Sequence, residues 1–229
     1  IEKIIYLSDR NSYVILTPVV RYGAVEIPVY SRKQIYDTDQ NGNVFQIERD
    51  DELEIQFMSV VVQQHPDFEE QLQEMDFFYL HKDRFLDEDW FLDAFQAWKN
   101  EGITVLGFNE LTNNRLNQHK ARVSIQVTSG TDWFDTSMEI KYGKQKASLK
   151  QLHKAIRNKS KFVQLGDGTM GILPEEWMKK IEAFFQAGEP EEEVLKIPKS
   201  NFSQIDELFD DEMISQEVKD ELAFYSRAF

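Results

Sequence analysis

Residues 123–185 read VSIQVTSGTDWFDTSMEIKYGKQKASLKQLHKAIRNKSKFVQLGDGTMGILPEEWMKKIEAFF, and their pattern decides the fold. From Val123 to Val127 apolar and polar residues alternate, which is the period of a half-buried strand. The alternation resumes after a turn at residues 128–132. Its apolar side comprises Phe134, Met138, Ile140 and Tyr142. Two such runs joined by a short loop that contains glycine predict an antiparallel hairpin.

The period becomes helical after this hairpin. Ser148 and Gln151 have the spacing of a capping box, in which each side chain satisfies a backbone N–H of the first turn. Leu149, Leu152 and Ile156 would then form the apolar stripe of a helix.

A second, smaller hairpin and a second helix follow. Phe162–Leu165 and Thr169–Leu173 flank Gly166-Asp167-Gly168, a strong turn signal. Pro174 suits the first position of a helix, where its missing N–H is not needed. Gly188 could end that helix in a left-handed conformation. The buried face would comprise Trp177, Ile181, Phe184 and Phe185. The predicted order is ββαββα.

Four short motifs occur within this unit in one order with short spacings. They are Asp132-Trp133-Phe134-Asp135, Ser148-Leu149-Lys150-Gln151-Leu152, Leu165-Gly166-Asp167-Gly168 and Leu173-Pro174-Glu175-Glu176-Trp177. The series resembles the helicase-associated region found just before the motor of bacterial Swi/Snf-family DNA-dependent ATPases. The N-terminal half of the chain shares only the general character. The resemblance implies a non-catalytic accessory piece whose partner is the C-terminal ATPase motor of the same polypeptide.

The composition fits a folded protein with a substantial core. The chain has 229 residues, 41% of them hydrophobic, which is enough for one large domain or two modest ones. The absence of cysteine excludes disulfides and thiolate-bound zinc and suits a reducing cytoplasm. No apolar run reaches the roughly 18 residues of a membrane span, and no signal peptide is visible. We expect a cytoplasmic protein with no membrane partner, nucleoid-associated if its parent engages DNA.

Both ends of the chain look like cuts in a longer sequence. The chain starts at Ile1 in strand-like sequence and stops at Arg227-Ala228-Phe229 in helix-like sequence. We therefore expect a motor beyond Phe229. A mature protein after processing is the alternative.

The charge is distributed unevenly. The net charge of −15 matches a DNA backbone poorly, because DNA binding depends on Lys and Arg that neutralise phosphates. Residues 141–161 nevertheless contain eight basic residues and no acidic one, so the other residues carry −23. Candidate contacts to duplex DNA or to the motor are Lys144, Lys146, Lys150, Lys154, Arg157 and Lys161. A solvated helix face is the alternative interpretation.

The N-terminal residues predict a meander followed by a hairpin. Strands are expected at Lys3–Leu7, Tyr13–Tyr22 and Ala24–Tyr30, and again at Val29–Tyr36 and Val44–Glu48.

The sequence between the last two strands, Asp37–Asn43 (DTDQNGN), admits two interpretations. Asp37, Asp39, Asn41 and Gly42, with Glu48 at position twelve, match part of an EF-hand calcium loop. Because strands rather than helices are expected on both sides, a hairpin turn is favoured.

Residues 51–106 predict two helices and a βαβ unit. Asp51–Gln64 could be a helix or a strand, and its length favours a helix; Pro66–Glu74 is a second helix. Strands at Phe77–Leu80 and Ile103–Leu106 would lie parallel, joined by a helix capped by Asp87. That helix carries Trp90, Phe91, Phe95 and Trp98 on one face. Such a stripe could stack nucleic-acid bases, but opposite acidic residues it favours a core role.

The domain organisation follows from two polar stretches. Residues 111–119 (LTNNRLNQH) are the best boundary, and residues 188–193 (GEPEEE) predict an exposed acidic turn. Two amphipathic helices are expected after Pro198, through Ile205, Leu208 and Phe209, then Val218, Leu222 and Tyr225. We expect an α+β fold of antiparallel hairpins alternating with short amphipathic helices in two packed subdomains. The predicted parts are an α/β subdomain (1–112), the helicase-associated core (119–188) and a helical connector (189–229) toward an absent motor.

No catalytic motif is present. Gly143-Lys144-Gln145 lacks the upstream glycine and the Ser/Thr of a phosphate loop, so we expect no ATP hydrolysis and no cofactor in this chain. The four histidines (His65, His81, His119, His153) lack the paired spacing of metal ligands and suit surface or structural roles. No G-x-S-x-G motif occurs. Asp132 and Asp135 are the least arbitrary acidic pair, and capping of the hairpin turn suits them better than hydrolysis.

Three functional hypotheses follow. The first is an accessory module that orients a Swi/Snf-type motor or its DNA. The second is an acidic protein-interaction scaffold for a basic partner, unrelated to DNA translocation. The third is a hydrolase with an acidic site.

Overall fold

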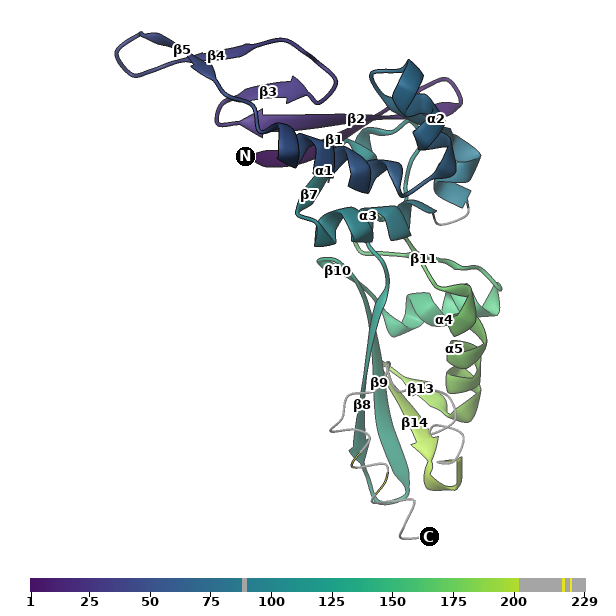
Figure 1. The fold of residues 1–229 in the computed structure, drawn as a ribbon. Coiled ribbons are helices and arrows are strands. Elements are labelled where there is room, and N and C mark those ends of the chain that lie inside the picture. The colour runs from purple at the N-terminus through teal and green to yellow at the C-terminus, as the bar shows by residue number, and fades with distance from the viewer. Residues whose placement is uncertain (88–89, 202–219, 221–222, 224–229) are drawn as a thin grey trace. The chain divides into compact units, whose positions relative to one another are not determined.

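The chain folds as two compact units, shown in Figure 1 by a computed structural model that describes residues 1–87, 90–201, 220 and 223. The division falls between Asn114 and Arg115, inside the polar stretch 111–119. Both units combine antiparallel strands with short helices, so the predicted α+β class is confirmed. The helices predicted beyond Pro198 lie outside the described residues, apart from a single 3₁₀ turn at Lys199–Asn201.

The first unit is built on one mixed sheet with the strand order β3-β2-β1-β7 and with β6 beside β2. The predicted meander is confirmed as β1 (Glu2–Arg10), β2 (Tyr13–Tyr22) and β3 (Val25–Pro28). β7 (Ile103–Leu106) pairs parallel with β1, and β6 (Phe78–His81) pairs antiparallel with β2. β6 and β7 thus run in the same direction, as predicted, but β2 and β1 lie between them.

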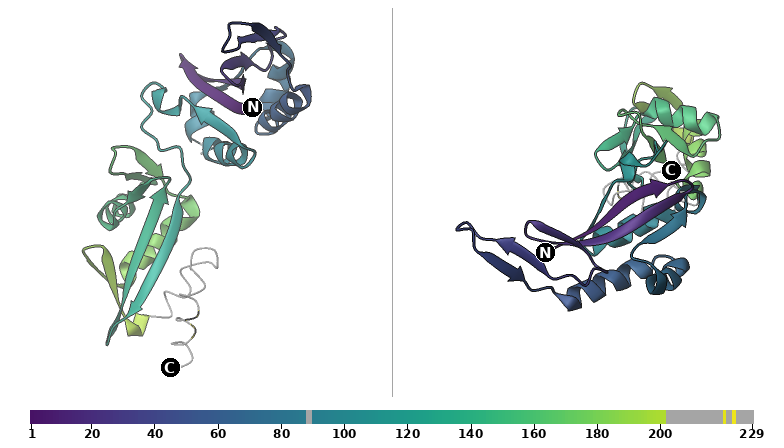
Figure 2. Two further views of the ribbon diagram at one scale, coloured as in Figure 1. Left: turned by 90° about the vertical axis from the view of Figure 1, so that its left-hand side faces the viewer. Right: turned by 90° about the horizontal axis from the view of Figure 1, so that it is seen from above.

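Three helices pack against one face of this sheet (Figure 2). They are α1 (Asp51–Val62), α2 (Pro66–Glu74) and α3 (Trp90–Asn100), which confirms the helix chosen for residues 51–64. Phe91 and Trp98 are fully buried, so the aromatic stripe of α3 is core, as favoured. Asp87, the predicted cap, ends a π-helix (Asp83–Asp87), and its side chain is outside the described part of the chain.

β4 (Ile35–Thr38) and β5 (Val44–Ile47) form a hairpin that is separate from the main sheet, and residues 34–48 are called the arm below. The predicted hairpin turn is confirmed. The Asp39 carboxylate accepts the backbone N–H groups of Asn41 and Asn43, each at 2.8 Å, and Gly42 takes a positive φ of 82°. The flanking elements are strands, whereas an EF-hand needs helices.

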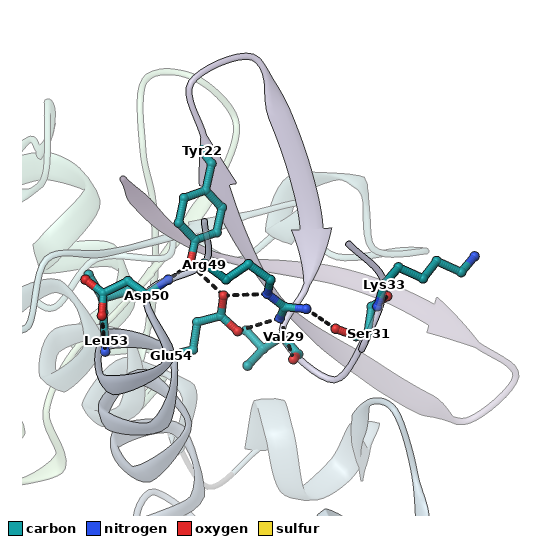
Figure 3. Close-up of polar contacts among 8 residues, drawn as sticks. All are labelled: Tyr22, Val29, Ser31, Lys33, Arg49, Asp50, Leu53 and Glu54. Atoms are coloured by element: carbon teal, nitrogen blue, oxygen red, sulfur yellow. Dashed lines mark hydrogen bonds and ion pairs between the residues drawn. The ribbon is translucent and has the colours of Figure 1, made fainter. Parts of the chain in front are cut away.

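A buried polar network holds the base of the arm (Figure 3). The Arg49 guanidinium donates to the backbone carbonyls of Val29 (3.1 Å) and Ser31, and it pairs with the Glu54 carboxylate of α1 at 2.5 Å. The Tyr22 hydroxyl donates to Glu54 Oε1 at 2.6 Å and accepts the backbone N–H of Asp50 at 2.9 Å. Burial, with the hydrogen bond to Glu54, raises the pKa of Tyr22 to about 12.

This network explains why the strand predicted at Val29–Tyr36 was mostly wrong. Residues 29–34 lie outside any strand, and only Ile35 and Tyr36 of the predicted range pair in β4. The carbonyls of Val29 and Ser31 accept hydrogen bonds from a guanidinium instead of from a neighbouring strand. The donor, Arg49, lies 18 residues further along the sequence from Ser31. The local periodicity of residues 29–36 therefore could not predict these hydrogen bonds.

We expect Glu54→Ala to lower the free energy of unfolding by about 3 kcal/mol, because it leaves the Arg49 charge without its carboxylate partner in a largely buried position. The Arg49 and Glu54 side chains are only 16% and 7% exposed. The control is Glu2→Ala, which breaks an exposed ion pair with Arg21 and should change stability by less than about 1 kcal/mol. Urea unfolding followed by circular dichroism measures both. Equal effects of the two variants would contradict a structural role for the network.

The second unit is organised around β9 (Trp133–Tyr142). β8 (Arg122–Ser129) pairs along one edge of β9, and β10 (Gln145–Ala147) and β14 (Val194–Pro198) share the other edge. The alternation predicted from the sequence is confirmed, with Phe134, Met138, Ile140 and Tyr142 all buried. β10 was not predicted, because three residues are too few to show a period.

Two helices and a small hairpin complete the predicted ββαββα order. They are α4 (Leu149–Arg157), β11 (Phe162–Gln164), β12 (Met170–Ile172) and α5 (Glu175–Ala187). Both helices share one apolar core with the buried face of β9. Ser148 caps α4 as predicted, since its Oγ accepts the Gln151 N–H at 3.2 Å. Pro174 lies one residue before α5 instead of at its first position.

Two predictions for the segment after α5 were wrong, the left-handed Gly188 and the helix over residues 189–198, whereas residues 192–193 do form an exposed acidic turn. Gly188 has an extended backbone, with φ −153° and ψ −174°, and not a left-handed one. Residues 189–198, assigned in part to a helical connector, form a hairpin of β13 (Glu189–Glu191) and β14. The glycine is needed for close approach, because a Cβ at residue 188 would overlap the Lys196 carbonyl oxygen and lie 2.9 Å from Ile197 Cγ1.

We expect Gly188→Ala to destabilise the second unit by about 2 kcal/mol, because the added methyl meets backbone that cannot move aside. Gly166→Ala is the control, since a Cβ there would meet only the Gln145 side chain at 3.8 Å. Thermal unfolding of the two variants measures the difference. A Gly188→Ala protein as stable as the Gly166→Ala protein would show that β14 does not lie against residue 188.

Candidate functional site

The six basic candidates lie on three successive parts of the second unit. Lys144 occupies the turn between β9 and β10, and Lys146 is on β10. Lys150, Lys154 and Arg157 are on α4, and Lys161 follows α4. All are exposed except Lys161, which is half-buried with its ammonium 5.5 Å from the centre of the Phe162 ring.

Lys150, Lys154 and Arg157 form one basic face of α4, called the α4 basic face below. Their spacings of four and three residues place them on the same side of the helix. The opposite side, with Leu149, Leu152 and Ile156, is buried in the core. Within the part of the chain that the structure describes, none of the three makes an ion pair. Three neighbouring positive charges are therefore directed at solvent.

Lys146 belongs to a different surface. Cross-strand pairing sets it directly opposite Lys141, and Arg122 is opposite Lys141 on the other side. Like charges in such positions destabilise a sheet. Glu139 offsets the repulsion, because its two carboxylate oxygens lie 2.9 Å from Lys141 Nζ and 2.7 Å from Lys146 Nζ. Lys146, followed by Lys141, holds the pKa of Glu139 below its usual value, and Glu139 raises the pKa of Lys146.

The six candidates consequently do not share one face. Lys141 and Lys146 alternate with the buried residues Ile140 and Ala147, so they point away from the core that α4 and α5 cover. The α4 basic face lies on the side of α4 that is turned away from the same core. A flat partner that covers the α4 basic face would leave Lys146 uncontacted.

His65 and His153 occupy structural positions, and the two acidic candidates lie in and next to β9. Asp135 lies in β9 opposite Lys196, while Asp132 lies in the turn before β9. His65 Nδ1 accepts the Asp67 N–H at 3.1 Å and so caps α2, and His153 stacks on Phe185 at 4.7 Å between ring centres. Among the described residues, no group of three or more His, Asp or Glu side chains is arranged to hold a metal ion. No helix among them is long and apolar enough to cross a membrane.

A comparison with protein-family models assigns the chain. A model described as bacterial SNF2 helicase associated matches residues 2–226. The chain belongs to this family, and the resemblance carried by the four motifs is confirmed. The match extends through the N-terminal half, where the sequence offered only general character. Neither curated proteins nor solved structures give a match.

We expect Glu139→Gln to lower the pKa of the Lys146 ammonium toward its ordinary value, because the carboxylate that stabilises the charged form is gone. Lys196 is the control. Glu191 raises its pKa in the same way on another hairpin, so Glu139→Gln should leave the pKa of Lys196 unchanged. Titration of the lysine side-chain NMR signals measures both. An unchanged Lys146 titration would mean that the Glu139 carboxylate does not stabilise the charged form of Lys146.

Proposed function

We propose that this chain is a non-catalytic accessory module of a bacterial Swi/Snf-type DNA-dependent ATPase and that it orients the DNA of the motor. The α4 basic face is the contact. The observation that supports this is the set of three exposed, neighbouring cations, with no ion pair among the described residues, in a member of a helicase-associated family.

The geometry of the helix suits a phosphate backbone. A rise of 1.5 Å per residue separates Lys150 from Lys154 by about 6 Å and Lys150 from Arg157 by about 10 Å along the axis. Long, flexible side chains at these intervals reach successive phosphates of one DNA strand. Such contacts position DNA without reading its sequence. Because Glu139 forms an ion pair with Lys146, Lys146 contributes less to the contact than the residues of α4.

The main rival is a purely structural role for the same charges. Lys154 and Arg157 lie in the last turn of α4, where cations stabilise the helix dipole. The Glu193 carboxylate accepts the Leu149 N–H at 3.3 Å and complements the other end. Lys150, in the first turn, gains nothing from the dipole. Its position supports a contact, because helix stability does not account for it.

The test is charge reversal of Lys150, Lys154 and Arg157 to Glu in the polypeptide that carries both this chain and its motor. We expect weaker binding of duplex DNA and a salt dependence of log K that is shallower by about 3, since each phosphate contact contributes about 0.9 to the slope. DNA-stimulated ATP hydrolysis should need more DNA to reach half its maximum. Fluorescence anisotropy across a salt series measures the affinity.

The matched control reverses Arg10, Lys99 and Lys179, three exposed basic residues on other elements, and changes the net charge equally. It should leave the slope unchanged. Unchanged DNA affinity and unchanged DNA-stimulated hydrolysis in the α4 variant would overturn the contact role and favour the acidic scaffold. Reduced hydrolysis with unchanged DNA affinity would indicate that the α4 basic face contacts the motor and not DNA.

A further inference from the structure

The arm carries a cluster of exposed apolar side chains on the first unit. Tyr36, Val44 and Phe45 are 53%, 70% and 47% exposed. The pairing register puts Tyr36 and Val44 on one face of the hairpin and Phe45, beside Asp37, on the other. Figure 1 and the right-hand view of Figure 2 show the hairpin projecting from the first unit. A two-stranded sheet is marginal by itself, and one that is apolar on both faces suits insertion into a groove.

The arm is held at its base while its far end is uncovered. Arg49, immediately after the arm, bonds the carbonyls of Val29 and Ser31, which come just before it. The ion pair with Glu54 fixes the same guanidinium to α1. Ile35 is buried at the base of the hairpin, so the two legs are clamped together where they leave the body. A clamped hairpin loses little conformational freedom on binding, which favours recognition.

The charge on the arm narrows the choice of partner. Residues 34–48 contain Asp37, Asp39 and Glu48 and no basic residue. The Asn43 side chain and the turn amides hold the pKa of Asp39 below its ordinary value, so it stays ionised. Phosphates would repel such an arm, which argues against DNA. Two arms would repel each other as well. The complementary surface is a protein groove with an apolar floor and a basic rim.

We propose that the arm docks into such a groove on the ATPase motor. This inference takes its partner from the proposed function, because a motor that translocates on DNA must itself present basic surface. The arm engages protein, whereas the α4 basic face engages DNA. The two contacts lie in different units and use opposite charges. Each can therefore be lost without the other.

The test places a photoreactive benzoylphenylalanine at Phe45 of the polypeptide that contains both this chain and the motor. Irradiation followed by mass spectrometry of peptides should give cross-links to the motor. Trp133, which is 48% exposed on the second unit, carries the same probe as the matched control and should give at least several-fold less motor cross-link. Tyr36→Ser with Val44→Ser should reduce the Phe45 cross-link about tenfold, as expected for the loss of apolar anchors.

Leu72→Ser with Met75→Ser removes exposed apolar side chains of α2 and should leave the cross-link unchanged. Cross-links from Phe45 to DNA, to a second copy or only to residues 1–229, or no cross-link, would overturn the inference. So would equal yields from Phe45 and Trp133. DNA affinity of the same proteins separates the two proposals, because the arm variants should bind DNA normally and the α4 variant should not.

Discussion

The strict alternation of β9 is the constraint on which the second unit depends. Each inward side chain from Phe134 to Tyr142 is buried against α4 and α5, and three other strands pair with the backbone of β9. A shift of one residue would turn this whole set outward and set Glu139 and Lys141 against the core. The packing tolerates little change elsewhere. A Cβ on Gly171 would lie 2.5 Å from the Tyr142 ring, so the ring occupies the space that a glycine leaves.

Local periodicity predicted the elements long enough to show it. The predicted bounds of the strands Tyr13–Tyr22 and Ile103–Leu106 match the structure to the residue, and the predicted ββαββα order is confirmed. The errors occur where a distant partner decides the conformation. β13 is acidic along the chain and β14 is only five residues long, and β14 is ordered by pairing with β9, about 60 residues earlier. A left-handed conformation was predicted for Gly188 because helix ends favour one, but Gly188 is extended. The close approach of the Lys196 backbone explains why this residue is a glycine.

The candidate site shows the same limit. The basic segment 141–161 is visible in the sequence, and the helical spacing of Lys150, Lys154 and Arg157 follows from the predicted helix. That Lys146 belongs to another surface could not be predicted, because it depends on β10 folding back onto β9. The sequence does contain the signal for its partner, since Glu139 and Lys141 alternate on one polar face. Without the register, the pairing of Glu139 with Lys146 stays hidden.

The uneven distribution of charge along the chain is compatible with the DNA contact that we propose for an acidic protein. Residues 1–114 contain 22 acidic and 9 basic residues, a net charge of −13, whereas the second unit, residues 115–229, contains 19 acidic and 17 basic residues, a net charge of −2. Within the second unit, residues 141–161 contain eight basic residues and no acidic one. Salt screens electrostatic interactions beyond about 8 Å at physiological ionic strength. A bound partner therefore interacts with the charges of the surface that it contacts and not with the net charge of −15. An acidic arm and a basic helix in one chain can therefore select different partners. Neutralising either surface would leave the core of the other unit unaltered.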